Sequence, residues 1–175
     1  QPRWLVPRHR MFWVDTRLGT RTVRAAPGLP AGRAEKLGDG SVAALSPGGV
    51  LAWQDADAAP RRIGGGGLAS AFTTAAAGNA WVYDAAQGRV RVLTPRGREV
   101  HSVRPLARSA GLQFPQQIAV FADGSFLLGG AGELWKFSST GIPAWRMDRI
   151  PGPVAESLPS SFQLAVDRRA GSFVL

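Results

Sequence analysis

Short apolar runs alternate with turn residues along the whole chain, and this pattern predicts β-strands joined by tight turns. Runs of four to seven residues, such as 11–15 and 41–45, end at glycine, proline, asparagine or aspartate. Strands bounded by turn residues produce this alternation. No window keeps a helical period over three turns. Residues 31–37 could make one helical turn at most, but Gly32 and Gly38 bound them. The sequence therefore predicts an all-β chain.

One glycine-anchored hairpin pattern recurs along the chain. The glycines that open the second strand of each unit are spaced 29, 46 and 47 residues apart: Gly49, Gly78, Gly124 and Gly171. A four-stranded antiparallel unit that recurs about every 40 residues is typical of a β-propeller blade. One twisted sheet cannot bury both of its faces alone, whereas blades stacked around an axis bury their faces against each other. A β-sandwich also has evenly spaced strands, but it does not repeat one glycine-anchored pattern.

The strands group into about four and a half blades of a single propeller segment. The expected blades cover residues 10–37, 41–63, 71–104, 117–150 and, incompletely, 162–175. We expect a segment of a larger protein with a ring of six or more blades, whose open edge is covered by further sequence or by another subunit, because exposed strand edges associate. We also expect residues 72–103 and 117–147 each to form a four-stranded sheet, packed face to face.

Residues 78–97 resemble an NHL repeat, the unit of a family of mostly six-bladed propellers. The pattern of that family is a glycine, an apolar run ending in aspartate, a turn, an arginine, an alternating strand and a closing turn. These positions are filled here by Gly78, Val82, Asp84, Arg89, Val90, Val92, Leu93, Pro95 and Gly97. Residues 114–120 are similar to the proline-led first strand of the family. Residues 112–145 depart from the pattern, because Gly130 stands in place of the aspartate and Glu133 in place of the arginine.

A second resemblance is to the quinoprotein-type propeller repeat, in which a tryptophan follows the turn glycine. It is carried by residues 133–137 together with Thr140, Gly141 and Trp145. Both families are propellers, so the two resemblances imply the same fold.

The chain is strongly basic, with 21 basic and 12 acidic residues and a net charge of +9. A positive field favours acidic partners, nucleic acid or anionic membrane surfaces. All basic residues except Lys36 and Lys136 are arginines, and they are scattered, so we interpret them as solvated surface with polyanion binding as the alternative.

The absence of cysteine excludes disulfides and thiolate metal sites and leaves the compartment open, although we favour an extracytoplasmic location, periplasmic or secreted, in a bacterium. No apolar run approaches the roughly 20 residues of a membrane helix.

Asp84 and Arg89 face each other across a tight predicted hairpin. A carboxylate at this position can accept hydrogen bonds from the backbone N–H groups of the turn and from the guanidinium. A catalytic role would need a second acid or base nearby, and the sequence indicates none. We therefore predict a structural turn latch formed by these two residues.

Other candidate groups have a structural interpretation. His9 and His101 lack the spacing of a zinc site, and His101 is expected on an outer strand. The glycine run 64–67 lacks the lysine and the helix of a phosphate-binding loop and is interpreted as a flexible link. Four tryptophans near the inner strands are interpreted as packing between blades, with stacking on RNA bases as the alternative: Trp13, Trp53, Trp81 and Trp135.

The sequence therefore favours a non-catalytic binding or scaffold module that holds a partner protein or a neighbouring subunit through the loops of one propeller face. We predict no catalytic residue, no metal and no cofactor. One alternative is a polyanion- or RNA-binding propeller that uses surface arginines. Another is a propeller enzyme, a lyase or a quinoprotein-like protein, whose site lies partly outside this segment. The preference for binding rests on analogy between folds.

Overall fold

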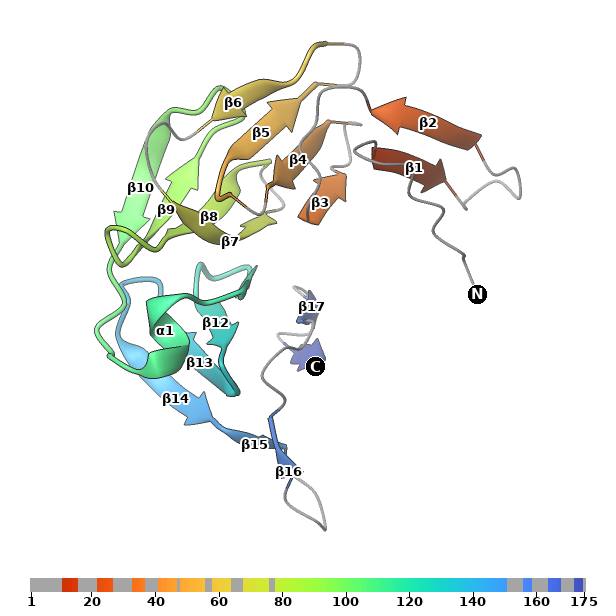
Figure 1. The fold of residues 1–175 in the computed structure, drawn as a ribbon. Helices are drawn as coiled ribbons and strands as arrows, with labels where there is room; N and C mark the ends of the chain where they lie inside the picture. Colours follow the sequence, from red (N-terminus) through yellow and green to blue (C-terminus); the bar gives the residue numbers. More distant parts are fainter. Residues whose placement is uncertain are drawn as a thin grey trace. The chain divides into compact units, whose positions relative to one another are not determined.

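The fold is shown in Figure 1, drawn from a computed structural model of the chain. The structure describes residues 11–15, 22–26, 33–36, 41–46, 48–55, 58–63, 68–75, 78–150, 156–158, 164–167 and 172–174. His9, Gly171 and the glycine run 64–67 lie outside these residues. The chain divides into two compact units, Gln1–Ile63 and Gly64–Leu175, and each is described by itself.

The first unit contains a hairpin and a four-stranded antiparallel sheet. The hairpin pairs β1 (Met11–Asp15) with β2 (Thr22–Ala26). The sheet has the order β3-β4-β5-β6, formed by β3 (Arg33–Lys36), β4 (Val42–Leu45), β5 (Leu51–Gln54) and β6 (Arg61–Ile63). Each strand pairs with the next one in the chain, as expected for a propeller blade.

The second unit contains two four-stranded sheets of the same kind. The first is formed by β7 (Ala69–Thr74), β8 (Ala80–Asp84), β9 (Arg89–Leu93) and β10 (Glu99–Val103). A single helical turn, α1 (Ala110–Gln113), precedes the second sheet. That sheet is formed by β11 (Gln117–Val120), β12 (Phe126–Gly130), β13 (Glu133–Phe137) and β14 (Pro143–Met147).

Two short antiparallel pairs complete the second unit. They are β15 (Arg149–Ile150) with β16 (Glu156–Ser157), and β17 (Ala165–Asp167) with β18 (Ser172–Val174). Within the described residues, no helix is long and apolar enough to cross a membrane.

The same tight turn joins the first and second strands of the three four-stranded sheets that the described residues form. Its closing residue is Gly49, Gly78 or Gly124, with φ of 75°, 78° and 79°. Each of these glycines donates its N–H to the carbonyl oxygen three residues earlier, at 3.0, 2.9 and 3.1 Å. Glycine adopts this left-handed conformation without a steric penalty, and a turn closed in this way is a common hairpin loop. The recurring turn glycines predicted from the sequence are confirmed at these three positions.

The two four-stranded sheets of the second unit pack face to face, as predicted for residues 72–103 and 117–147. Residues from both sheets form one buried cluster: Ala71, Tyr83, Val90, Val103, Leu112, Ile118, Val120, Phe126, Leu128 and Phe137. The rings of Trp81 and Phe126 lie 6.2 Å apart across the two sheets. The Ser70 hydroxyl also donates to the Pro115 carbonyl at 2.7 Å.

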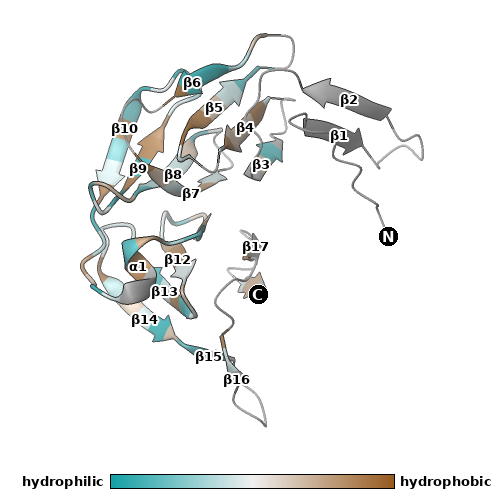
Figure 2. Cartoon of the chain, in the orientation of Figure 1, coloured by the Kyte–Doolittle hydropathy of each residue, from teal (hydrophilic) through white to brown (hydrophobic). Residues whose placement is uncertain are grey.

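Burial falls from the inner strands to the outer strand of each sheet. Every residue of β12 is buried, whereas most of β10 and β14 is exposed. Figure 2 shows the same gradient in hydropathy, with β4 and β9 hydrophobic and the outer strands β6 and β10 hydrophilic. The packing role predicted for the tryptophans is confirmed for Trp53, which is fully buried, and for Trp81 and Trp135, which pack against the buried cluster.

The structure differs from the sequence analysis in two details. Within residues 31–37, where one helical turn was considered, Arg33–Lys36 form the strand β3, which pairs with β4 along its whole length. The expected division between residues 37 and 41 therefore falls inside one sheet, because backbone pairing with β4 overrides the helix propensity of this short segment. The helical turn α1 lies in the linker between two sheets and was not predicted.

Candidate functional site

The candidate site lies at one end of the β7–β10 sheet. Because successive strands of an antiparallel sheet reverse direction, the turn between β8 and β9 and the chain that leaves β10 lie at the same end. The β8–β9 turn is short, whereas the linker from Arg104 to Gln116 is long and contains α1. These two segments surround a pocket.

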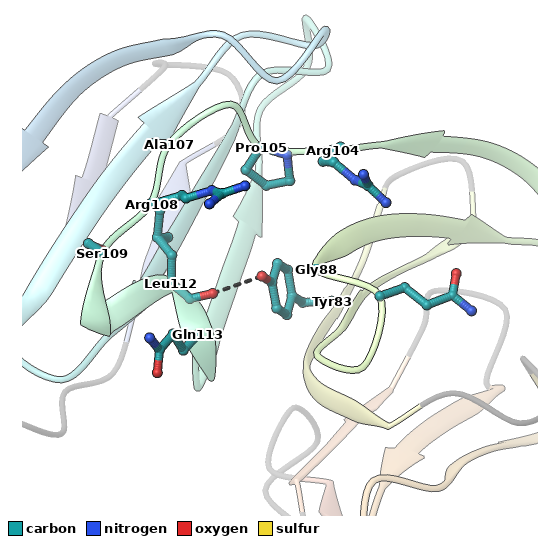
Figure 3. Close-up of a pocket in the computed structure, with 10 residues that line it drawn as sticks. Tyr83, Gly88, Arg104, Pro105, Ala107, Arg108, Ser109, Leu112 and Gln113 are labelled. Carbon is teal, nitrogen blue, oxygen red and sulfur yellow. Dashed lines mark hydrogen bonds between the residues drawn. The ribbon is translucent and has the colours of Figure 1, made fainter.

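The pocket has a volume of about 580 Å³, which lies within the range of small-ligand sites. The turn and the linker line it with Tyr83, Gln87, Gly88, Arg104, Pro105, Ala107, Arg108, Ser109, Leu112 and Gln113. Figure 3 shows that Tyr83 and Leu112 meet at its centre, while Arg104, Pro105 and Arg108 lie together on one side of that contact.

Tyr83 connects the sheet to the linker. Its hydroxyl donates a 2.8 Å hydrogen bond to the Leu112 carbonyl, and the residue is only 4% exposed. Burial, and secondly the charge of Asp84, raise the pKa of the Tyr83 hydroxyl. The phenol therefore stays protonated and acts as a hydrogen-bond donor that fixes α1 against the β8–β9 hairpin.

The linker is also held at both ends. The Leu106 N–H donates to the Gly141 carbonyl at 2.8 Å near its start, and the Gln116 N–H donates to the Gly129 carbonyl at 2.8 Å at its end. These backbone bonds join the linker to the β11–β14 sheet. The linker is therefore fixed by both sheets of the second unit, although it has almost no regular secondary structure of its own.

Asp84 fixes the turn that forms the other side of the pocket. Its carboxylate is 1% exposed, and Oδ1 accepts hydrogen bonds from the backbone N–H groups of Ala86 at 3.1 Å and Gln87 at 3.2 Å. The nearest cation is Arg91, whose Nη1 lies 3.6 Å from Oδ2. A carboxylate in this position satisfies donors that the tight turn leaves without a strand partner.

In the structure, the arginine that lies nearest Asp84 is not the one predicted from the sequence. Asp84 and Arg89 are opposite each other in the strand register, as expected. However, Arg89 Nη1 bonds Glu99 Oε1 at 3.0 Å and the Ser102 hydroxyl at 3.2 Å. The outer strand β10 provides this competing carboxylate, and Arg91 approaches Asp84 instead. The described residues therefore show no Asp84–Arg89 ion pair, and the structural latch of Asp84 and Arg89 stays a prediction.

Four arginines of the sheets are paired with carboxylates. Arg89 and Arg91 share Glu99, and the hydrogen bond from Arg91 is the main cause that lowers the pKa of the Glu99 carboxyl. Arg61 pairs with Asp55 at 2.6 Å, and Arg146 with Glu133 at 3.0 Å. These exposed or half-exposed pairs contribute little to stability, but they neutralise the charge of the surface around them.

The arginines of the pocket differ from these. Arg104 and Arg108 are exposed, and neither has an ion-pair partner among the residues that the structure describes. The hydroxyl oxygen of Ser109 is buried and has no hydrogen-bond partner in the same part of the chain. The pocket thus combines positive charge with an unused polar group.

This pocket was not predicted from the sequence. The signal available was the length of the segment between the strand predicted at residues 99–103 and the one predicted at 117–121, with two arginines four positions apart. His101 lies exposed on the outer strand β10 and is not among the lining residues. Among the described residues, no group of three or more histidine, cysteine, aspartate or glutamate side chains could hold a metal ion.

Comparison with known proteins identifies the fold but no family. No protein-family profile and no curated protein sequence matches the chain. The chain is similar in structure to virginiamycin B lyase from Staphylococcus aureus, with a TM-score of 0.57 and 13% identity over 83% of this chain and 50% of the lyase. It is also similar to apo AztD from Citrobacter koseri, with a TM-score of 0.53 and 16% identity over 79% of this chain and 42% of AztD.

These similarities show that the chain has the fold of part of a β-propeller, as the sequence predicted. The chain spans half the length of the lyase and less of AztD. At this level of identity the similarity concerns the fold alone, since unrelated functions share such folds.

Proposed function

We propose that the protein is a binding module of the β-propeller class, with NHL-type repeats, which holds a protein partner through one loop end of its β7–β10 sheet. The observation that carries this proposal is the pocket between the β8–β9 turn and the 104–116 linker. Its two arginines have no ion-pair partner among the described residues, and hydrogen bonds to both sheets fix its walls. A preformed concave site with a few polar groups is the usual form of a binding site.

The charge pattern favours a local site over general polyanion binding. A nucleic-acid surface needs a continuous stripe of basic side chains to follow the phosphates. In the described part of the chain, Arg61, Arg89, Arg91 and Arg146 each share an ion pair with a carboxylate. If polyanion binding were the function, affinity for nucleic acid would fall steeply with salt, and a salt titration would reveal it.

The similarity to virginiamycin B lyase makes an enzyme the second alternative. A general base in the pocket would need a titratable group whose pKa lies near neutral pH. Tyr83 is the one phenol that lines it, but its pKa is raised and its hydroxyl is bound to the Leu112 carbonyl. This arrangement suits a structural donor, so we favour binding.

Site-specific photo-crosslinking in the producing cells tests the proposal. A photoreactive residue replaces Gln87, which is exposed and lines the pocket, and in a matched control it replaces Arg96, which is exposed in the β9–β10 turn at the opposite end of the same sheet. We expect a protein adduct from position 87 and none of that mass from position 96. Adducts from position 96 only, or from neither position, would contradict binding at this end.

A further inference from the structure

The residues that line the pocket also indicate which class of ligand it binds. On the basis of the proposed function, we propose that this pocket binds a carboxylate of an acidic peptide segment of the partner protein, with Arg104 and Arg108 as the cationic donors.

The charges of the pocket support an anionic ligand. Both guanidinium groups belong to the same fixed linker, and Figure 3 shows them on the same side of the Tyr83–Leu112 hydrogen bond, with Pro105 between them. A guanidinium is permanently charged and presents parallel N–H donors that match the two oxygens of a carboxylate. No described carboxylate of the chain is paired with either group.

The uncharged polar groups of the pocket add donors that a carboxylate can use. The exposed amide side chains of Gln87 and Gln113 line it from the turn and from α1. Ser109 also lines the pocket, and its hydroxyl oxygen is buried without a partner among the described residues. Buried polar groups in native proteins normally have a partner.

The size and the apolar part of the lining favour a peptide over a small free anion. A volume of about 580 Å³ is far larger than one carboxylate needs. Pro105, Ala107, Leu112 and the Tyr83 ring offer apolar surface beside the arginines. The methylene groups of an acidic side chain, or a neighbouring apolar residue, can cover this surface while the carboxylate reaches the guanidinium groups. A doubly charged phosphate would lose more hydration against the same apolar surface, so we favour a carboxylate.

Fluorescence anisotropy with the full chain and three labelled decapeptides tests this inference. The first peptide alternates glutamate with leucine, the second replaces every glutamate by glutamine, and the third replaces it by phosphoserine. We expect the glutamate peptide to bind at least about ten-fold more tightly than the glutamine peptide, since its charged hydrogen bonds are lost there. A wild-type protein that prefers the phosphoserine peptide, or does not distinguish glutamate from glutamine, would overturn the assignment.

Substitution of the two pocket arginines tests whether the glutamate peptide binds in this pocket. Both pocket arginines are exposed, so solvent weakens each contact, and we expect Arg104→Gln and Arg108→Gln each to weaken glutamate-peptide binding about five-fold. Arg96→Gln removes the same charge at the opposite end of the sheet and should change the affinity less than about two-fold. An equal loss in all three variants would show diffuse attraction and would refute a site. Because all three side chains are exposed, unchanged melting temperatures should accompany these effects.

The crosslinking experiment separates this inference from the proposed function. If the adduct at position 87 persists in Arg104→Gln and Arg108→Gln at wild-type yield, the partner binds at this end without these arginines, and only the carboxylate assignment fails. If the protein with the photoreactive residue at position 87 and both arginines intact gives no adduct, the proposed function itself fails.

Discussion

Replacing Gly141 by alanine should destabilise the second unit and disturb the candidate pocket, because the turn before β14 sits against the start of the pocket linker. A Cβ atom at this position would overlap the carbonyl oxygen of Arg104 and lie 2.8 Å from Cγ1 of Val103. Arg104 is the first residue of the linker, and Val103 is the last residue of β10. The carbonyl is backbone, so the clash cannot be relieved by rotating a side chain.

Two contributions set the size of the effect. Gly141 has φ of +86°, and an alanine in this left-handed conformation costs about 1–2 kcal/mol. The clash also forces the linker away and removes the 2.8 Å hydrogen bond from the Leu106 N–H to the Gly141 carbonyl, which costs about 1 kcal/mol more. We therefore expect Gly141→Ala to lower the free energy of unfolding by about 2–3 kcal/mol.

Gly124→Ala is the matched control. Gly124 has φ of +79° and closes the same kind of turn, but the nearest atom to its added Cβ would be the Ser139 Cβ at 3.4 Å. Its loss should therefore be about 1–2 kcal/mol, from the backbone conformation alone.

Urea denaturation followed by tryptophan fluorescence compares the two variants, and glutamate-peptide affinity reports on the pocket. Gly141→Ala should lose more stability than Gly124→Ala and should also bind the peptide more weakly while still folded. Equal losses of stability, with unchanged peptide binding in both variants, would refute the argument that Gly141 fixes the linker.

Three further predictions concern single side chains. Asp84→Ala should lower the free energy of unfolding by about 1–3 kcal/mol, because two turn N–H groups lose their acceptor; Asp84→Asn should recover part of this loss in urea denaturation, and an alanine variant with wild-type stability would contradict the latch. Ala131→Asn should raise stability by about 0.5–1 kcal/mol, since Ala131 is left-handed with φ of 50° and precedes Gly132 in a turn that favours Asn-Gly; a lower melting temperature would contradict this. Glu99 has a lowered pKa, so its stabilisation is present above the pKa of the unfolded chain and is lost as pH falls through the folded value. Glu99→Gln should therefore melt below wild type at neutral pH and together with it in acid, and a difference that persists in acid would contradict the assignment to the Arg91 pair.

The hairpins were predictable because their determinants are local. A glycine such as Gly78 or Gly124, placed after a short apolar run, specifies both the turn and the register of the two strands beside it. The strand Arg33–Lys36 was not predictable in this way. Its residues favour helix, and its extended form depends on hydrogen bonds to β4. The four residues of α1 are too few to show a helical period.

The site was less predictable than the fold, because non-local contacts determine it. The Tyr83 hydroxyl and the Leu112 carbonyl are 29 positions apart and meet only when the two sheets pack. Likewise, the sequence places Arg89 opposite Asp84, but it does not show that Glu99 on the next strand attracts Arg89. Which of several arginines is left without a carboxylate depends on all these pairings together.

The turn between the second and third strands differs between the two sheets of the second unit, and this difference bears on the pocket. In the β7–β10 sheet, the turn after the second strand is long enough for Asp84 to hold two backbone N–H groups and for Gln87 to reach the pocket. In the β11–β14 sheet, the equivalent turn contains only Ala131 and Gly132 between the paired residues Gly130 and Glu133. This shorter turn has no aspartate and no side chain comparable to Gln87. The same position that breaks the repeat pattern in the sequence therefore removes the turn that the pocket requires, which explains why the two sheets share a fold but differ in the surface that they present at this end.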